Sequence, residues 1–146
     1  MKHLCIAITL SMALAWSGCG NNSGSGSTIN GNWTAILTGS QDLNLSVTLT
    51  QSSGSAVTVS NLSFTTSQSC FDTGASATGA FSVTGTTNGV TTGSFVMTIV
   101  SGASNSNGMN QLMLQGTLTN NSITGTWNLS GTGAGCTGSG TFTMAD

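Results

Sequence analysis

An alternation of apolar and polar residues with a period of two runs from Ile29 almost to the end of the chain, and it limits the fold more than any other feature. Successive side chains of a β-strand point to opposite faces, so this alternation predicts strands with one apolar and one polar face. The chain contains no proline, and after Cys19 no stretch shows the apolar period of an amphipathic helix. The sequence therefore predicts an all-β fold.

About eight segments carry the alternation, and short links rich in Gly, Ser, Asn and Thr join them. The residues expected to share the inward face are Ile29, Gly31, Trp33, Ala35 and Leu37; Leu43, Leu45, Val47 and Leu49; Val57, Val59, Leu62 and Phe64; Phe81 and Val83; Phe95, Met97 and Ile99; Leu112, Leu114, Gly116 and Leu118; Ile123, Gly125, Trp127 and Leu129; and Gly138, Gly140, Phe142 and Met144. Because no link has a helical pattern, we expect an antiparallel up-and-down meander that closes into a small barrel in preference to a sandwich.

Two local irregularities are predicted within this pattern. The apolar phase shifts by one residue near Ser60 and Asn61, which indicates a β-bulge. Asn120 and Asn121 separate two alternating segments and predict a tight turn, because Asn tolerates the positive φ that such turns require. Glycines on the inward face suit the bends and close strand approaches of a small barrel.

The chain is almost free of charge. Lys2 and His3 lie at the N-terminus, so Asp42, Asp72 and Asp146 are the only charged side chains from residue 19 onward. General acid–base catalysis needs a group that titrates near the working pH, and the many serines here have no His or Lys to activate them. Without basic side chains the electrostatic basis of nucleic-acid binding is missing too. We therefore predict a protein that is not an enzyme and has no catalytic residues, cofactor, metal site or nucleic-acid partner.

Residues 4–16 form an apolar run behind Lys2 and His3, which is the order of an export signal. The run holds about 13 residues and falls short of the ~20 that a membrane-spanning helix needs. Cleavage has two candidate sites. A soluble-type site at Ala13-Leu14-Ala15 would release the chain, and a second site lies at Ser17-Gly18-Cys19.

Ser17-Gly18-Cys19 resembles the lipobox of bacterial lipoproteins, in which the signal is cut before a cysteine that receives lipid. Trp16 stands where that pattern commonly has Leu. The resemblance implies a lipoprotein signal peptide over residues 1–18 and a palmitate-bearing lipid on Cys19, which makes the membrane a partner of the chain. Gly20 replaces the Asp that retains such lipoproteins in the inner membrane, so the resemblance favours a lipid anchor in the outer membrane of the cell envelope.

The chain is expected to divide into three parts. The signal peptide at 1–18 is followed by the lipidated cysteine and a Gly/Ser tether at 19–28, and residues 29–146 form a single all-β domain. Cysteine usage agrees with this division. Once Cys5 leaves with the signal and Cys19 is acylated, Cys70 and Cys136 can pair as a disulfide in an oxidising compartment. As metal ligands the two would lack a His or a third Cys.

Gly31-Asn32-Trp33 resembles the G-x-W of the calycin group, the lipocalins and avidins, in which the Trp closes one end of an up-and-down barrel. The resemblance implies an interior binding site, which Trp33, Leu45, Val47, Leu114 and Trp127 would line. The chain departs from the group because it has no Tyr for biotin, no Arg for the Trp, and Ala35 in place of the avidin Asn. Biotin binding is therefore not expected. The alternative to a binding site is that Trp33 and Trp127 are residues of the hydrophobic core.

Two further motifs have a functional and a structural interpretation. Asp72-Thr73-Gly74 resembles the loop of aspartic proteases, but the polar residues before it favour a plain loop. Thr-x-Thr units at Thr48/Thr50, Thr117/Thr119 and Thr141/Thr143 suit a solvated strand face; a surface- or ice-binding ladder and the lumen of a transmembrane barrel are the alternatives.

The sequence as a whole favours a non-enzymatic structural or adhesive module of the cell envelope. The second hypothesis is a calycin-like binder of a small neutral or apolar ligand. The partner would then be an envelope component or that ligand, and the sequence leaves the oligomeric state open.

Overall fold

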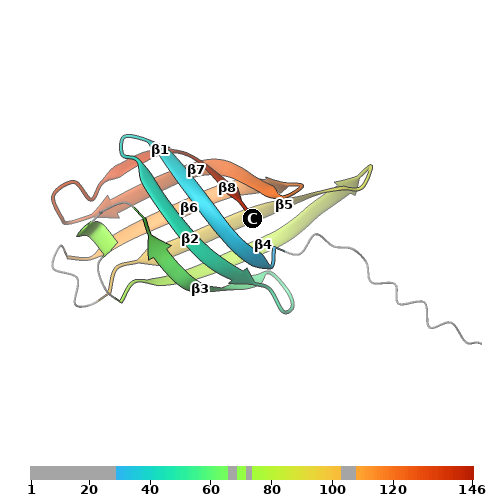
Figure 1. Ribbon diagram of the computed structural model, residues 1–146, viewed down its shortest axis with the longest axis horizontal. Helices are drawn as coiled ribbons and strands as arrows, with labels where there is room; N and C mark the ends of the chain where they lie inside the picture. Colours follow the sequence, from blue (N-terminus) through green and yellow to red (C-terminus); the bar gives the residue numbers. More distant parts are fainter. Residues whose placement is uncertain (1–28, 66–68, 72–73, 103–107) are drawn as a thin grey trace, which may run out of the picture.

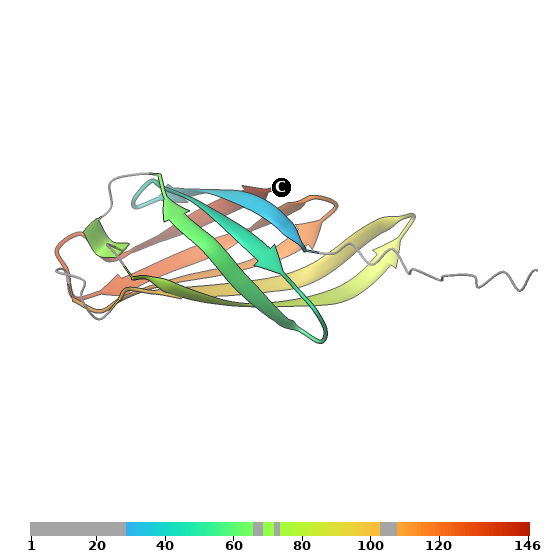
Figure 2. The ribbon, with the colours of Figure 1, turned by 60° about the horizontal axis from the view of Figure 1, so that its bottom comes forward.

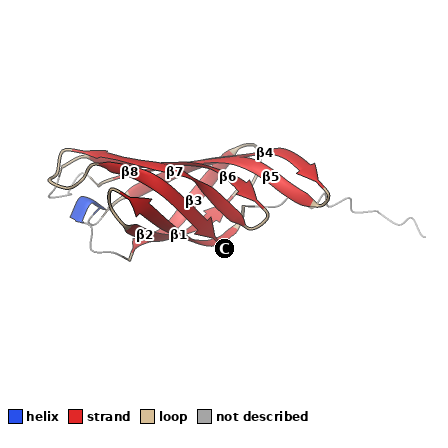
Figure 3. Cartoon of the chain, turned by 90° about the horizontal axis from the view of Figure 1, so that it is seen from above, coloured by secondary structure: helices blue, strands red, loops and turns tan. Residues whose placement is uncertain are grey.

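The computed structural model describes residues 29–65, 69–71, 74–102 and 108–146. Within these residues the chain forms eight strands and one short 3-10 helix. In chain order they are β1 (Gly31–Gly39), β2 (Leu43–Thr50), β3 (Ala56–Phe64), η1 (Ser69–Phe71), β4 (Ser76–Thr87), β5 (Val90–Val100), β6 (Asn110–Thr119), β7 (Ser122–Gly131) and β8 (Gly138–Ala145). Apart from the one turn of helix, Figure 3 shows strands throughout.

The strands form a closed antiparallel barrel in which each strand pairs with the next (Figure 1). β8 returns to β1 and closes the sheet, with Ala35 opposite Met144 and Leu37 opposite Phe142. Two-residue turns join β4 to β5 and β6 to β7, and each has an Asn at positive φ, Asn88 at 52° and Asn120 at 57°. The predicted all-β meander, its closure into a barrel and the turn at Asn120 are confirmed.

Because successive strands run in opposite directions, the links between them alternate between the two ends of the barrel (Figures 1 and 2). The terminal end holds the start of β1, the end of β8 and the β2–β3, β4–β5 and β6–β7 turns. A Cβ placed on Gly31 would lie only 2.7 Å from the Asp146 carboxylate, so the two ends of the domain meet there. The opposite, disulfide end holds the β1–β2, β5–β6 and β7–β8 links and η1 with Cys70.

The barrel interior is filled by apolar side chains that belong to one cluster. Aromatic rings lie over glycines of the neighbouring strands and fill the space that the missing side chains leave. A Cβ on Gly93 would lie 2.2 Å from the ring of Phe81, and a Cβ on Gly116 would lie 2.9 Å from the ring of Phe142. Leu37, Leu45 and Leu114 are fully buried in the same cluster, as the alternation predicts.

The outer face is polar, because Thr, Ser, Asn and Gln occupy most outward positions of the strands. Apolar inside and polar outside is the reverse of the arrangement that a lipid-facing barrel requires. Val83 departs from the prediction: it was expected inside but is 52% exposed. It lies beyond the last β3–β4 pair, Ala56 with Ala80, so no β3 side chain covers it. The β4–β5 register also shifts directly after it, between Val83 and Gly85.

The bulge predicted at Ser60 and Asn61 is confirmed in β3. Ser63 pairs with Ser46 and Ser60 pairs with Thr48, so one extra residue lies in β3. Asn61 takes up the irregularity at a φ of 51°. Its side-chain amide donates to Thr48 Oγ1 at 3.1 Å, which ties the bulge to β2.

Candidate functional site

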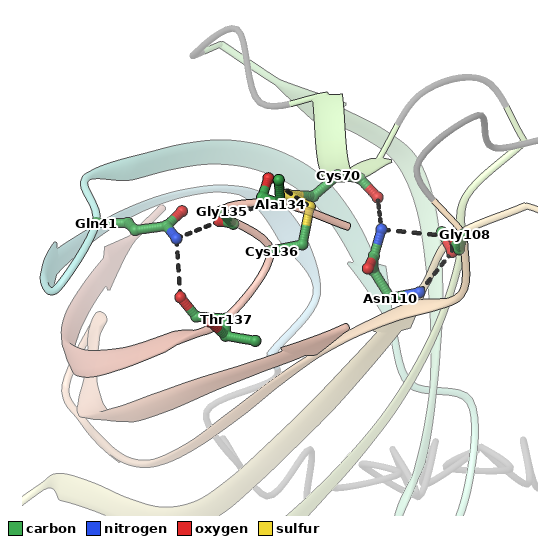
Figure 4. The surroundings of a disulfide bond; sticks show 9 residues. Gln41, Cys70, Gly108, Asn110, Ala134, Gly135, Cys136 and Thr137 are labelled. Carbon is green, nitrogen blue, oxygen red and sulfur yellow. Dashed lines mark hydrogen bonds between the residues drawn. A yellow bond between two sulfur atoms is a disulfide. The ribbon is translucent and has the colours of Figure 1, made fainter. Parts of the chain in front are cut away.

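Cys70 and Cys136 form the predicted disulfide at the disulfide end of the barrel (Figure 4). Their Cα atoms are 5.6 Å apart, and 66 residues separate them in sequence. Cys70 belongs to η1, and Cys136 lies just before β8. Both side chains are buried, at 2% and 0% exposure. The bond therefore joins the β3–β4 link to the β7–β8 link from inside the cluster.

Asn110 holds the Cys70 side of this bond from the first position of β6. The side chain is 2% exposed, and Nδ2 donates to Cys70 O at 2.9 Å and to Gly108 O at 3.4 Å. These two carbonyl acceptors fix the amide orientation, because a flipped amide would place oxygen against oxygen. Asn110 Oδ1 is buried and accepts no hydrogen bond from the described residues.

Gln41 holds the Cys136 side from the β1–β2 link. Its Nε2 donates to Gly135 O and, at 2.8 Å, to Thr137 O, so it spans the loop on either side of Cys136 (Figure 4). Gln41 Oε1 is a second buried acceptor that has no partner among the described residues. Both amides thus use their donors on backbone carbonyls around the disulfide.

A seam separates the disulfide-end half of β3 from β4. The two strands pair only at Ala56–Ala80, Val57–Gly79 and Thr58–Thr78. Phe71 of η1 packs there and stacks on Phe64, with ring centroids 4.9 Å apart and planes 7° apart. Five partly buried hydrophobic residues flank the seam: Val59, Leu62, Phe64, Ala75 and Ala77.

The five predicted ligand-lining residues all lie in the apolar cluster, at 3% exposure or less. Trp33 Nε1 donates to Ile29 O at 2.8 Å, and Trp127 Nε1 donates to Thr38 O at 3.1 Å, so each indole bonds to a backbone carbonyl. Leu114 and Trp127 are direct cross-strand partners, and Val47 is the partner of Trp33. The residues therefore meet inside one barrel as packed neighbours of the core.

Three grooves lined by described residues lie around the barrel. A hollow of about 430 Å³ crosses the outer face of β5, β6 and β7. A groove of about 260 Å³ lies over β1, β2 and the Asn61 bulge. A third, of about 480 Å³, lies beside Met109, Asn110 and Gly131. Leu45, Leu114 and Trp127 line none of these three, while Trp33 and Val47 contribute to the second.

Carboxylates are sparse in the described part of the chain. Asp42 lies in the β1–β2 link at one end of the barrel and Asp146 follows β8 at the other. Among the described residues no three His, Cys, Asp or Glu side chains gather to hold a metal ion, and no helix is long and apolar enough to cross a membrane. Asp72 and Cys19 lie outside the described residues.

This chain matches no family model, no curated protein and no solved structure.

Sequence reasoning missed the residues that organise the disulfide end. Asn110 has a sequence signal, because it shares the inward phase of Leu112 and Leu114 and is therefore a polar residue at a core position. Gln41 has no comparable signal, since a glutamine in a turn is ordinary. Phe71 was not expected in the core, because it lies outside every alternating segment.

Proposed function

We propose that this chain is a lipid-anchored protein of the cell envelope whose β-domain is a non-enzymatic structural or adhesive module. The observation that carries the proposal is the distribution of side chains across the barrel wall. The inside is occupied by the protein's own apolar side chains, and the outside is a neutral surface of hydroxyls and amides. An interior that holds the protein's own apolar side chains and strands that carry no charged side chain suit a rigid body that acts through its outer surface.

The position of the termini supports an anchor at Cys19. β1 begins at the terminal end, so a tether over residues 19–28 would hold that end toward the membrane and turn the disulfide end away. A flexible Gly/Ser tether of about nine residues has an r.m.s. span on the order of 15–18 Å. The barrel would then stand just clear of an outer-membrane surface.

The anchor is tested by mass spectrometry of the membrane fraction, which should find an acylated N-terminus at Cys19. Cys19→Ala should move the domain out of that fraction. Recovery of soluble chain that begins between residues 11 and 18 contradicts the anchor.

The absence of catalysis is tested in a deletion strain. Loss of the protein should weaken envelope integrity or surface attachment, measured as detergent sensitivity and as adherent cell number. Wild-type protein and the triple variant Asp42→Asn, Asp72→Asn, Asp146→Asn should restore the phenotype equally, because a module does not use these carboxylates. Failure of the triple variant alone, with the barrel still folded by circular dichroism, points to carboxylate chemistry and overturns this part.

The seam between β3 and β4 favours a second function, the binding of a small apolar ligand. Its partly exposed hydrophobic residues pack against the apolar cluster, and Phe71 stacks on one of them, Phe64. The neutral dye N-phenyl-1-naphthylamine serves as the probe. Fluorescence that rises on mixing with wild type and increases further with Phe71→Ala supports this function, and a signal no greater than that of a buffer blank rejects it.

A further inference from the structure

The hollow on the outer face of β5–β7 is built from matching positions of three adjacent strands. Ser94 pairs with Thr117 and Thr117 with Thr124; Val96 pairs with Gln115 and Gln115 with Thr126. These two cross-strand rows form the rims of the hollow. β5, β6 and β7 are neighbouring strands of the barrel, and residues of all three line the hollow.

Two facing glycines lie between the rims of the hollow. Gly116 pairs with Gly125 between the two rims. A Cβ on Gly125 would lie 2.0 Å from Gln115 O, and a Cβ on Gly116 would lie 2.6 Å from Thr124 O. The two strand backbones therefore approach more closely than side chains allow, and the Phe142 ring occupies the space beside Gly116 where a side chain would lie.

The polar side chains on the rims are exposed and make no side-chain hydrogen bond within the described residues. They are Ser94, Gln115, Thr117, Thr124 and Thr126. The smaller groove over β1 and β2 differs in this respect. There Thr48 Oγ1 donates to Asn32 Oδ1 at 2.7 Å, and Ser46 Oγ lies 2.8 Å from Ser63 Oγ. The polar rim groups of the β5–β7 hollow therefore remain available to a ligand, whereas these groups of the β1–β2 groove bond to one another.

Polar positions continue beyond the hollow onto the neighbouring strands. Thr143 is the cross-strand partner of Thr124, and Thr141 is the partner of Thr126. Thr38 of β1 extends the second row, with its hydroxyl 3.3 Å from that of Thr141. An extended partner could therefore follow the rows from the hollow across β8.

We propose that the β5–β7 hollow binds a neutral, hydroxyl-rich glycan chain. The proposal rests on the adhesive form of the function proposed above and names its partner. Strands β5 to β8 and β1 carry no charged side chain. A charged partner would lose hydration there without a counter-charge, whereas hydroxyls both donate and accept and so match the hydroxyls of a neutral sugar.

The test is affinity electrophoresis of the full chain, purified from membranes, in native gels that contain a soluble neutral polysaccharide. Dextran, soluble starch, hydroxyethylcellulose and glucomannan serve as neutral probes, and alginate as the acidic one. At least one neutral polysaccharide should retard the protein, and alginate should not. The triple variant Thr117→Val, Thr124→Val, Thr126→Val keeps side-chain shape and strand propensity but removes three rim hydroxyls, and it should raise the dissociation constant at least tenfold.

The matched control uses a threonine row that has no hollow. Thr50 pairs with Thr58 and Thr58 with Thr78 on β2–β4, and all three are exposed. The variant Thr50→Val, Thr58→Val, Thr78→Val should bind like wild type. Circular dichroism melting of both variants verifies that each barrel is folded.

Three results overturn the glycan site: no retardation by any neutral polysaccharide, equal retardation by alginate, or equal loss of binding in both triple variants. Wild-type protein that inhibits ice recrystallisation, with the inhibition lost only in the Thr117, Thr124 and Thr126 variant, would show that the same rows bind ice. That result also overturns the glycan site. The adhesion assay in the deletion strain is independent of these gels. If attachment is lost on deletion while no glycan binds, the adhesive module stands and only its partner is wrong.

Discussion

At the scale of single residues, Asn110 shows how one polar side chain is accommodated in an apolar barrel. It occupies an inward position of β6, where a leucine would continue the pattern. Its amide donates to Cys70 O in the irregular η1 turn. Its own Oδ1 is left buried and unpaired among the described residues. The residue thus holds the loop of the disulfide against the wall of the barrel.

Asn110→Ala is expected to lower the free energy of unfolding by about 1–3 kcal/mol, because the buried hydrogen bonds from Nδ2 to Cys70 O and Gly108 O are lost. Urea denaturation followed by tryptophan fluorescence measures the change. Asn128→Ala is the control, since Asn128 is exposed on the outer face of β7. Equal stability of the two variants would show that the hydrogen bonds of Asn110 are dispensable.

Gly125 makes a second residue-scale prediction. An added Cβ would lie 2.0 Å from Gln115 O and 2.5 Å from the Gly116 Cα, so the backbone must shift. Overpacking of this kind costs roughly 1–3 kcal/mol or more, and Gly125→Ala should melt well below wild type. Gly85→Ala is the control, because its Cβ would meet only Thr92 Oγ1 at 3.6 Å. A melting temperature for Gly125→Ala that equals that of Gly85→Ala would mean that the close strand approach at Gly125 is not required.

At the scale of elements, the disulfide compensates for weak pairing between β3 and β4. Most neighbouring strands pair over most of their length, whereas β3 and β4 share three residue pairs. η1 covers the remaining opening with Phe71, and Cys70 fastens η1 to the loop before β8. The bond therefore holds in place an element that no strand ladder holds.

The double variant Cys70→Ser, Cys136→Ser should lower the free energy of unfolding by on the order of 4 kcal/mol. This is the chain-entropy value for the loop that the bond closes, whose two cysteines are 66 residues apart in sequence. That is a large share of the ~5–15 kcal/mol of a typical domain. Denaturant unfolding of wild type and variant measures the loss. Dithiothreitol should lower the wild-type melting temperature and leave the variant unchanged. An equal effect on both proteins would mean that reduction acts elsewhere.

At the scale of the whole molecule, the period-two alternation predicts the barrel because it assigns nearly every strand residue to a face. The two-residue turn at Asn120 even sets a register, since folding about it places Gly116 opposite Gly125. The facing glycines between the rims of the β5–β7 hollow could therefore be predicted from the sequence. The exposure of Val83 could not, because it depends on where β3 stops pairing with β4. Neither could the core position of Phe71, which depends on a disulfide between distant links.

Closure of the barrel also protects the sheet edges of a chain with so little charge. Sheet edges are commonly protected by Lys, Pro or inward-pointing charges, and from residue 19 onward this chain has no Lys or Pro. A barrel removes most edges by pairing the last strand with the first, as β8 does with β1. The outer hydroxyls then supply hydration in place of charge. Barrel closure therefore protects the strand edges that charged residues protect in open sheets.

The last prediction follows from this absence of charge. Among the described residues Asp42 and Asp146 are the only charged side chains, and they lie at opposite ends of the barrel. Salt acts on stability chiefly by screening charge pairs, so sodium chloride between 0.05 and 0.3 M should change the free energy of unfolding by less than about 0.5 kcal/mol. Sulfate strengthens the burial of apolar surface and should raise stability at the same ionic strength. Calorimetry in the two salts measures both effects. Equal and large effects of chloride and sulfate would mean that electrostatic interactions contribute substantially to the stability of this barrel.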